Sequence, residues 1–292
     1  MQRDLIGYGG KPPKLVWPGN GRLALNFVIN LEEGSESNIL EGDEQSESYL
    51  TDLPGVIPLK GERHLSSESM FEYGSRAGIW RLLELFDKLP ITFFATGQAL
   101  EKNTKIAEFL KSSPYEVAGH GWRWISYRAI PKEVEREHIK KTIQTIEHLT
   151  NKKVKGWYTG RASVNTRELI VEQGLEYDSD SYADDLPYWV NVLSKPHLIV
   201  PYNLDCNDAR FGMTPGFNQG EDFYYYLKAT FDQLYLEGST CPKVMTVGLH
   251  PRFSGRPGRA NAVARFIEYI KTFDRVWICT REEIAKHFKE GF

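Results

Sequence analysis

The chain has 292 residues, and its 36 basic and 39 acidic side chains give a formal net charge of −3 at pH 7. Hydrophobic residues make up 41% and charged residues 26%, which is typical of globular proteins and excludes wholesale disorder and a collagen-like structure. The sequence contains no Lys/Arg-rich run and no apolar stretch of the roughly 18 residues that span a bilayer, so we expect neither a nucleic acid nor a membrane as a partner.

The first strong element is a nearly continuous apolar run at 22–31, in which every second residue is hydrophobic. Such a run predicts a strand that is covered on both faces, as in a parallel sheet. Helical and strand patterns then alternate. The expected strands are 90–96, 116–119, 155–159, 176–179, 197–202, 243–249 and 275–279, and the expected helices are 76–88, 98–111, 132–149, 165–174, 220–237, 259–272 and a last one that opens at 280.

About seven strand–helix units favour an α/β fold of the (β/α) barrel type, and a doubly wound open sheet is the alternative. No repeat or linker divides the chain, so one domain is expected over 1–292, with an N-terminal arm at 1–21. A long insertion at 34–75 shows little periodicity, and eight acidic residues but no Lys or Arg lie between positions 32 and 52. We interpret it as a solvated excursion, or as a lid or subunit contact beside the site.

Polar side chains follow several of the expected strands. In a parallel barrel the catalytic groups lie at the C-terminal ends of the strands, because the interior is packed solid. The polar residues at or near these ends are Glu32, Glu33, His120, Arg161, Asp178, Asp180, His250 and Arg252. The other histidines show no ligand spacing and are interpreted as surface or capping residues; they are His64, His138, His148, His197 and His287.

The cysteines and the first residues predict the location. Cys206, Cys241 and Cys279 are far apart and form no Cys-x-x-Cys pair, and residues 1–10 lack the apolar core of a signal peptide. We therefore expect a reducing, cytoplasmic location and no structural zinc.

Several segments together resemble the polysaccharide-deacetylase (NodB-homology) superfamily, and within it the branch of metal-independent allantoinases and related cyclic-imide hydrolases. They include Asn30-Leu31-Glu32-Glu33-Gly34, His120-Gly121-Trp122-Arg123-Trp124, residues 156–161 and 177–189, Asn207-Asp208-Ala209-Arg210-Phe211 and Gly248-Leu249-His250. The resemblance implies a distorted (β/α) barrel and a homo-oligomer, with a tetramer as the first expectation.

Two departures bear on a metal site. Metal-dependent deacetylases carry Thr-Phe-Asp-Asp-Gly, where this chain has Glu32 and Glu33 in place of the aspartates. They also carry His-Ser/Thr-x-x-His, where this chain keeps His120 but has Trp124 at the second histidine. Because an indole nitrogen is only a donor, Trp124 cannot be a ligand. We expect no cofactor; a divalent ion such as zinc, if present, would lie near Glu33 and His120.

The resemblance implies a hydrolase that opens a cyclic amide or imide, such as the hydantoin ring of allantoin, with a place in purine catabolism. We expect Glu32 or Glu33 to be the general base, with a pKa raised by apolar neighbours such as Trp124, and His120 or His250 to protonate the leaving nitrogen. Arg161 and the Asp178/Asp180 pair would orient these groups. The expected substrate contacts are Trp122, Trp124, Tyr158, Asp178 and Arg252.

The sequence leaves the identity of the ring and two alternative functions open. Pro251-Arg252 stands where allantoinases of this branch have Cys-Arg, so the ring that is opened is not assigned. A metal-dependent N-deacetylase of N-acetylated saccharides is the first alternative function. A relative that binds a ligand without catalysis is the second.

Overall fold

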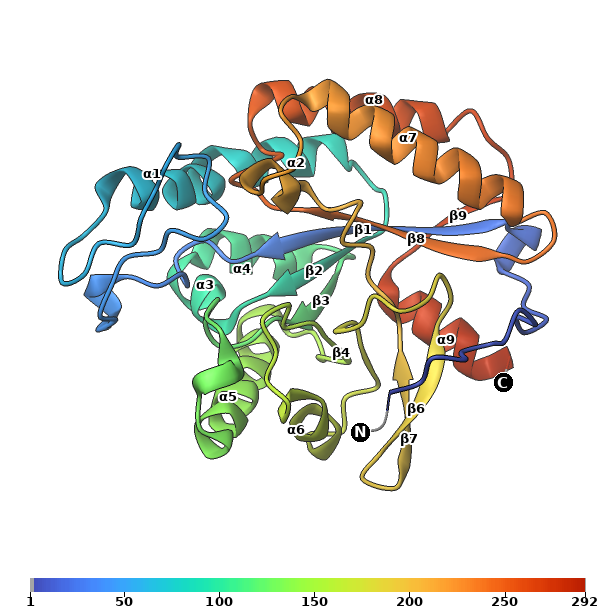
Figure 1. Cartoon of the computed structure of the whole chain (residues 1–292), viewed down its shortest axis with the longest axis horizontal. Coiled ribbons are helices and arrows are strands. Elements are labelled where there is room, and N and C mark those ends of the chain that lie inside the picture. The colour runs from blue at the N-terminus through green and yellow to red at the C-terminus, as the bar shows by residue number, and fades with distance from the viewer. Residues whose placement is uncertain (1–2, 292) are drawn as a thin grey trace.

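The computed structural model describes residues 3–291. It shows a curled sheet with helices packed around it (Figure 1). The strands are β1 (Leu23–Leu31), β2 (Ile91–Ala95), β3 (Glu116–Gly119), β4 (Gly156–Trp157), β5 (Tyr177–Asp178), β6 (Tyr188–Val192), β7 (Lys195–Ile199), β8 (Lys243–Leu249) and β9 (Val276–Ile278). They lie in the order β6-β7-β5-β4-β3-β2-β1-β8, and β9 pairs with the start of β1. This half-barrel confirms the predicted distorted (β/α) barrel.

The α-helices surround this sheet, and α7 and α8 lie side by side near β1 and β8 (Figure 1). They are α1 (Leu65–Tyr73), α2 (Ile79–Leu85), α3 (Gly97–Lys102), α4 (Thr104–Ser112), α5 (Lys132–Thr150), α6 (Thr166–Glu172), α7 (Gly220–Glu237), α8 (Pro257–Ile270) and α9 (Arg281–Gly291). Short 3-10 or π turns are η1 (Pro18–Asn20), η2 (Ile39–Glu41), η3 (Gly74–Gly78), η4 (Tyr127–Ala129) and η5 (Asp208–Gly212). No helix in the described part of the chain is long and apolar enough to cross a membrane.

Strand β1 is buried along its whole length, as its apolar pattern predicts. Leu25, Phe27 and Ile29 belong to the large core between the sheet and the outer helices. Val28 packs instead in a small cluster with side chains of other strands, among them Phe94 of β2. Because side chains alternate along a strand, the residues at even positions after Val28 point toward the barrel interior.

Several element boundaries match the sequence signals. Helix α6 follows Asn165, and Gly174 after it has a φ of +76°, which suits glycine at the end of a helix. Helix α9 begins with the expected capping box, because Glu283 N donates to Thr280 Oγ1 (3.2 Å) and Thr280 N donates to Glu283 Oε2 (2.7 Å).

Two expected helices differ in the structure. The helix expected at 76–88 begins at Leu65 and runs through α1, the π turn η3 and α2, so part of the 34–75 insertion is helical. The helix expected at 98–111 breaks at Asn103, whose side chain accepts a hydrogen bond from Ile106 N (3.2 Å) and caps α4. Asn at an N-cap competes with helix continuation, which explains the break.

The sequence pattern did not predict β6. The strand expected at 197–202 lies at 195–199 and pairs antiparallel with β6, while the other pairs between the strands β1 to β9 are parallel. The turn between them holds Leu193 and Ser194 at φ of +51° and +61°. Such a turn normally carries Gly or Asn, so the sequence contained no hairpin signal there.

Candidate active site

A cavity of about 410 Å³ opens at the C-terminal ends of β1, β3 and β8. Its wall includes six of the predicted site residues, which are Glu32, His120, Trp124, Tyr158, Arg161 and His250. The insertion adds Tyr49 and Leu50 to the wall, so part of this segment lies beside the site. The tertiary structure therefore brings together side chains from widely separated parts of the chain.

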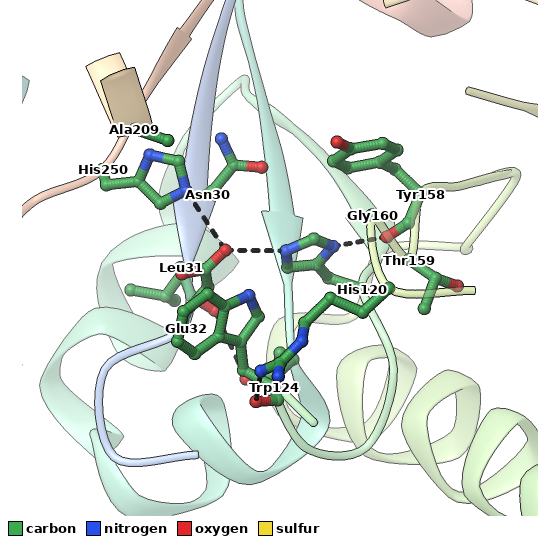
Figure 2. A network of polar contacts seen from close by, with 12 residues as sticks. Asn30, Leu31, Glu32, His120, Trp124, Tyr158, Thr159, Gly160, Ala209 and His250 are labelled. Atoms are coloured by element: carbon green, nitrogen blue, oxygen red, sulfur yellow. Dashed lines mark hydrogen bonds and ion pairs between the residues drawn. The ribbon is translucent and has the colours of Figure 1, made fainter. Parts of the chain in front are cut away.

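Glu32 lies at the centre of the polar network at the bottom of the cavity (Figure 2). Its Oε1 is 3.0 Å from Nε2 of His120 and 3.2 Å from Nε2 of His250. Only 2% of the Glu32 side chain is exposed. A single carboxylate oxygen thus contacts two imidazole rings that reach it from β3 and β8.

The remaining ring nitrogens decide where protons lie. Nδ1 of His120 contacts the carbonyl oxygen of Tyr158, which can only accept, so this nitrogen carries a hydrogen (Figure 2). Nδ1 of His250 lies 2.6 Å from Oδ1 of Asp208. The other oxygen of Asp208 accepts from His250 N (2.8 Å) and Ser254 N (3.1 Å), which orients the carboxylate. His250 is therefore held between two acidic side chains.

Arg252 supplies a fixed positive charge beneath the network. Its guanidinium is fully buried, and Nη1 lies 2.7 Å from Oε2 of Glu32 and 3.6 Å from Oε1 of Glu33. The guanidinium carbon lies 4.8 Å from the ring centroid of Trp124 and 4.7 Å from that of Phe71. Arg252 does not line the cavity, so the prediction that it binds substrate is not supported by its position, which instead makes it the counter-charge of Glu32.

The pKa of Glu32 differs from the expectation. Burial by itself raises this pKa, but the charges of His250 and Arg252 outweigh burial and hold it well below the ordinary value. The prediction of a raised pKa is therefore wrong for Glu32, because the sequence pattern did not reveal the buried arginine. For His250, burial lowers the pKa, but Glu32 and Asp208 raise it to about 9. The site contains an ionised carboxylate beside a protonated imidazole.

Glu33 occupies a different environment. Burial raises its pKa, and Oε1 accepts a hydrogen bond from Arg252 N (3.1 Å). The carboxyl presses against the helical run at Gly74, where a Cβ would lie 2.6 Å from Oε1. Glu33 is not part of the cavity wall, so of the two glutamates only Glu32 is placed to meet a substrate.

Two further predicted residues lie away from the cavity. Trp122 packs against α3 and α5, with Nζ of Lys141 3.5 Å from its ring centroid, so the expected substrate wall is not there. Asp178 is fully buried and pairs with Arg167 (2.8 Å) and with His197 (3.1 Å). His197 is therefore a buried hydrogen-bond partner of Asp178 rather than the expected surface or capping residue.

Asp180 acts on the cavity wall through the backbone. Its two carboxylate oxygens accept hydrogen bonds from Thr159 N (2.8 Å) and Gly160 N (2.7 Å), and both of these residues line the cavity. Burial, with the charge of Asp178, raises the pKa of Asp180 to about 6. This geometry fits a residue that positions the 159–160 segment.

Trp124 and Arg161 form one side of the cavity with the insertion. The ring of Trp124 stacks on that of Tyr49 at a centroid distance of 6.0 Å, and Arg161 lies over both rings. Nη1 of Arg161 donates to the carbonyl of Trp124 (3.1 Å). This flat, cationic wall suits a planar polar ring.

Comparisons with known proteins show the family of this chain. Residues 66–178 match the family model described as polysaccharide deacetylase. A Schizosaccharomyces pombe protein named "Putative polysaccharide deacetylase" is 45% identical over 307 aligned residues, covering 97% of this chain and 96% of that protein. The chain belongs to the polysaccharide deacetylase family. It is thus a hydrolase that acts on carbon–nitrogen bonds.

Two crystal structures are similar over nearly the whole chain. One is of PuuE allantoinase and the other of a probable polysaccharide deacetylase from Pseudomonas aeruginosa PAO1. Each is 48% identical, with a TM-score of 0.96 and coverage of 99% of this chain and 98% of that chain. These likenesses confirm the predicted family and agree with its allantoinase branch.

The site does not fit the divalent ion that the resemblance implies for metal-dependent deacetylases. Among residues 3–291, no group of three or more His, Cys, Asp or Glu side chains is arranged to hold a metal ion. Trp124 lies against Arg252, whose guanidinium already brings a positive charge to Glu32. Glu33 contacts Arg252 as well. A second cation beside this arginine would be repelled.

Sequence reasoning missed several polar residues of the site, among them Asp208 and Asn30. Asp208 was part of a segment that carried the family resemblance, but it follows no expected strand and was not assigned a role. Asn30 lies within β1 and lines the cavity; because its neighbours in β1 are mostly apolar, the sequence pattern did not single it out. The alternation of β1 contained the signal for Asn30, since it shares a face with Glu32.

Proposed function

We propose that this chain opens the ring of a cyclic amide, an allantoin-type hydantoin or a related cyclic imide, by acid–base hydrolysis without a catalytic metal ion. The observation that supports this most strongly is the ion pair between Arg252 and Glu32, with both imidazoles on the same carboxylate. The 48% identity to PuuE allantoinase supports the same class of substrate.

The chemistry of the ring explains why the reaction can proceed with the charge of Arg252 in place of a catalytic metal ion. The leaving nitrogen of a hydantoin or imide lies beside carbonyl groups, so resonance stabilises it as it departs. An ordinary acetamide lacks this stabilisation, and a Lewis acid then lowers the barrier by several kcal/mol. The enzyme therefore has to activate water, stabilise the oxyanion and protonate the nitrogen.

The proposed proton path runs through the three contacting side chains. Glu32, which is hydrogen-bonded to His120, takes a proton from the water that attacks the ring carbonyl, and the carbon–oxygen bond forms. His250, held protonated by Asp208 and Glu32, gives its proton to the ring nitrogen as the carbon–nitrogen bond breaks. The ring opens to a carboxylic acid and an amide or ureido group. The acid proton restores His250 and the proton on Glu32 leaves to the solvent, so that a carboxylate remains, which Arg161 in the cavity wall would stabilise.

A hydrolysis screen tests this function. Purified protein is incubated with allantoin, hydantoin, succinimide and N-acetylglucosamine oligomers, each with and without a chelator, and its metal content is measured. We expect ring opening at equal rates in both conditions. Acetate release that disappears with the chelator, together with stoichiometric zinc, would instead establish the metal-dependent deacetylase. Tight binding of rings without turnover would indicate the non-catalytic relative. The cytoplasmic location and the tetramer stay predictions.

A further inference from the structure

Asn30, a residue of the cavity wall, has one buried amide oxygen without a hydrogen-bond partner among the described residues. Its side chain follows Val28 on the interior face of β1, is 1% exposed and lines the cavity wall with Glu32, His120 and His250 (Figure 2). Oδ1 of Asn30 has no hydrogen-bond partner among the described residues. A buried acceptor without a donor is costly, and in a cavity wall it points to a ligand.

The contacts of the amide nitrogen fix the orientation of Asn30. Nδ2 donates to the carbonyl of Leu249 (3.3 Å) and to the hydroxyl oxygen of Tyr202 (3.1 Å). Because the Leu249 carbonyl can only accept, the nitrogen has to face it, and a flipped amide would place two acceptors together. Oδ1 is thereby the end that remains for a ligand.

Neighbouring side chains keep this arrangement rigid. The Tyr202 hydroxyl also accepts a hydrogen bond from Nδ2 of Asn207 (3.0 Å). Asn207 is oriented in turn by Ala209 N, which donates to its Oδ1 (2.7 Å). The ring of Tyr202 stacks on that of Tyr158 at a centroid distance of 4.6 Å. Asn30 cannot turn toward another donor without breaking this network.

We infer that Oδ1 of Asn30 accepts a hydrogen bond from a ring N–H of the substrate. This inference rests on the proposed function and narrows it to rings that keep a free N–H, which are unsubstituted cyclic ureides and imides. An N-alkylated ring would leave the buried oxygen unpaired and would place a methyl group against it. A site that is built to bind an N–H rejects analogues that lack it.

Equilibrium binding tests the inference. Hydantoin, 1-methylhydantoin and 3-methylhydantoin are titrated by calorimetry into the wild-type protein and into Asn30→Ala, each with the additional substitution Glu32→Gln so that the rings are not opened during the titration. In the wild type, one methyl isomer is expected to bind about tenfold or more weakly than hydantoin, because the acceptor is left unpaired. In Asn30→Ala this preference should shrink to about twofold or less, since the methyl group and the substitution remove the same contact. The isomer that shows this coupling identifies the ring nitrogen.

Asn26→Ala is the matched control. Asn26 lies on the same face of β1, is fully buried and also leaves Oδ1 unpartnered, while its Nδ2 donates to the carbonyl of Cys279 (2.8 Å). Asn26 does not line the cavity, so its substitution should leave the preference for hydantoin unchanged. An equal loss of preference in both variants would overturn the inference, because it would then reflect general loosening of the strand.

The same ligands separate the two proposals. Rings that bind with the Asn30-dependent preference but are not opened would contradict the proposed function and support the role of Asn30. Ring opening without discrimination between hydantoin and both methyl isomers, or with discrimination that survives in Asn30→Ala, would overturn the role of Asn30 alone. Failure of all three rings to bind would overturn both.

Discussion

Glu32 is surrounded by more charge than other acidic side chains of the cavity wall. Two imidazoles contact one of its oxygens and a guanidinium lies 2.7 Å from the other. Removal of its charge would leave Arg252 buried with Glu33, at 3.6 Å, as its remaining ion-pair contact among the described residues. The two glutamates are adjacent in the sequence but face different environments, so they should respond differently to the same substitution.

We predict that Glu32→Gln lowers kcat by about 100-fold or more, because the amide cannot take a proton from water. Glu33→Gln keeps an oxygen that can accept a hydrogen bond from Arg252 N, so it should lower kcat by less than about tenfold. Its effect is expected mainly on the free energy of unfolding. Steady-state kinetics and urea unfolding of both variants provide the comparison. Equal losses of kcat would contradict the separate roles.

His250 should set the alkaline limb of the pH profile. As the proton donor it acts only when protonated, and its pKa of about 9 keeps it protonated through neutral pH. We therefore expect kcat to fall as the pH rises through about 9. Asp208→Asn removes one of the charges that raise this pKa, so the limb should move to lower pH. A limb that stays in place in Asp208→Asn would show that another group is the donor.

At the scale of elements, the helical run of α1, η3 and α2 reaches the site through glycines. A Cβ at Gly78 would lie 2.0 Å from the carbonyl oxygen of Pro251, between His250 and Arg252. A Cβ at Gly74 would collide with Glu33. The π turn η3 lies at this contact, as such turns often do at functional sites. The close packing of α1, η3 and α2 thus fixes the positions of Glu33 and of the 250–252 backbone.

We predict that Gly78→Ala destabilises the protein by about 2 kcal/mol or more and lowers activity, because the added methyl group displaces the 250–252 backbone. Gly258→Ala is the matched control: Gly258 lies in α8 with open space around its Cβ position, so the change should be neutral or slightly stabilising. Urea unfolding and kcat/KM of both variants test the pair. A Gly78 variant as active as the control would contradict the tight contact.

At the scale of the whole molecule, ion pairs tie the insertion to the barrel. Asp43 of the insertion pairs with Arg123, and Asp52 pairs with Arg259 of α8 (2.8 Å). Tyr49 and Leu50 between these anchors are thereby held in the cavity wall. The sequence predicts this insertion to be a solvated excursion, or a lid or subunit contact; two of its acidic residues serve as these anchors.

Global stability should decrease as the pH rises above neutrality. The folded pKa of His250 is raised from 6.5 to about 9, so its stabilising contribution is complete below 6.5 and is lost as the pH rises through 9. We expect the urea midpoint of the wild type to fall across this range and that of His250→Gln to change less. Equal pH dependence in the two proteins would contradict the raised pKa.

Residue pattern alone was sufficient for the parallel core and for the strand ends that carry Glu32, His120 and His250. It could not separate Glu32 from Glu33, because a one-residue step reverses the face but not the chemistry of a carboxylate. It also missed the β6-β7 hairpin, whose turn has positive φ at Leu193 and Ser194 without glycine.

The amino-acid sequence by itself determined the alternation of strands and helices, the family and the loss of one metal-ligating imidazole to Trp124. The alternation follows from local periodicity, which acts over short distances along the chain, whereas the family and the replacement at Trp124 follow from the resemblance of several segments to known motifs. Only the tertiary structure decided that Arg252 is the counter-charge of Glu32, that Asp208 is hydrogen-bonded to His250 and that Trp122 lies outside the cavity. Burial and charge pairing depend on neighbours in space, and segments from opposite ends of the chain supply them here.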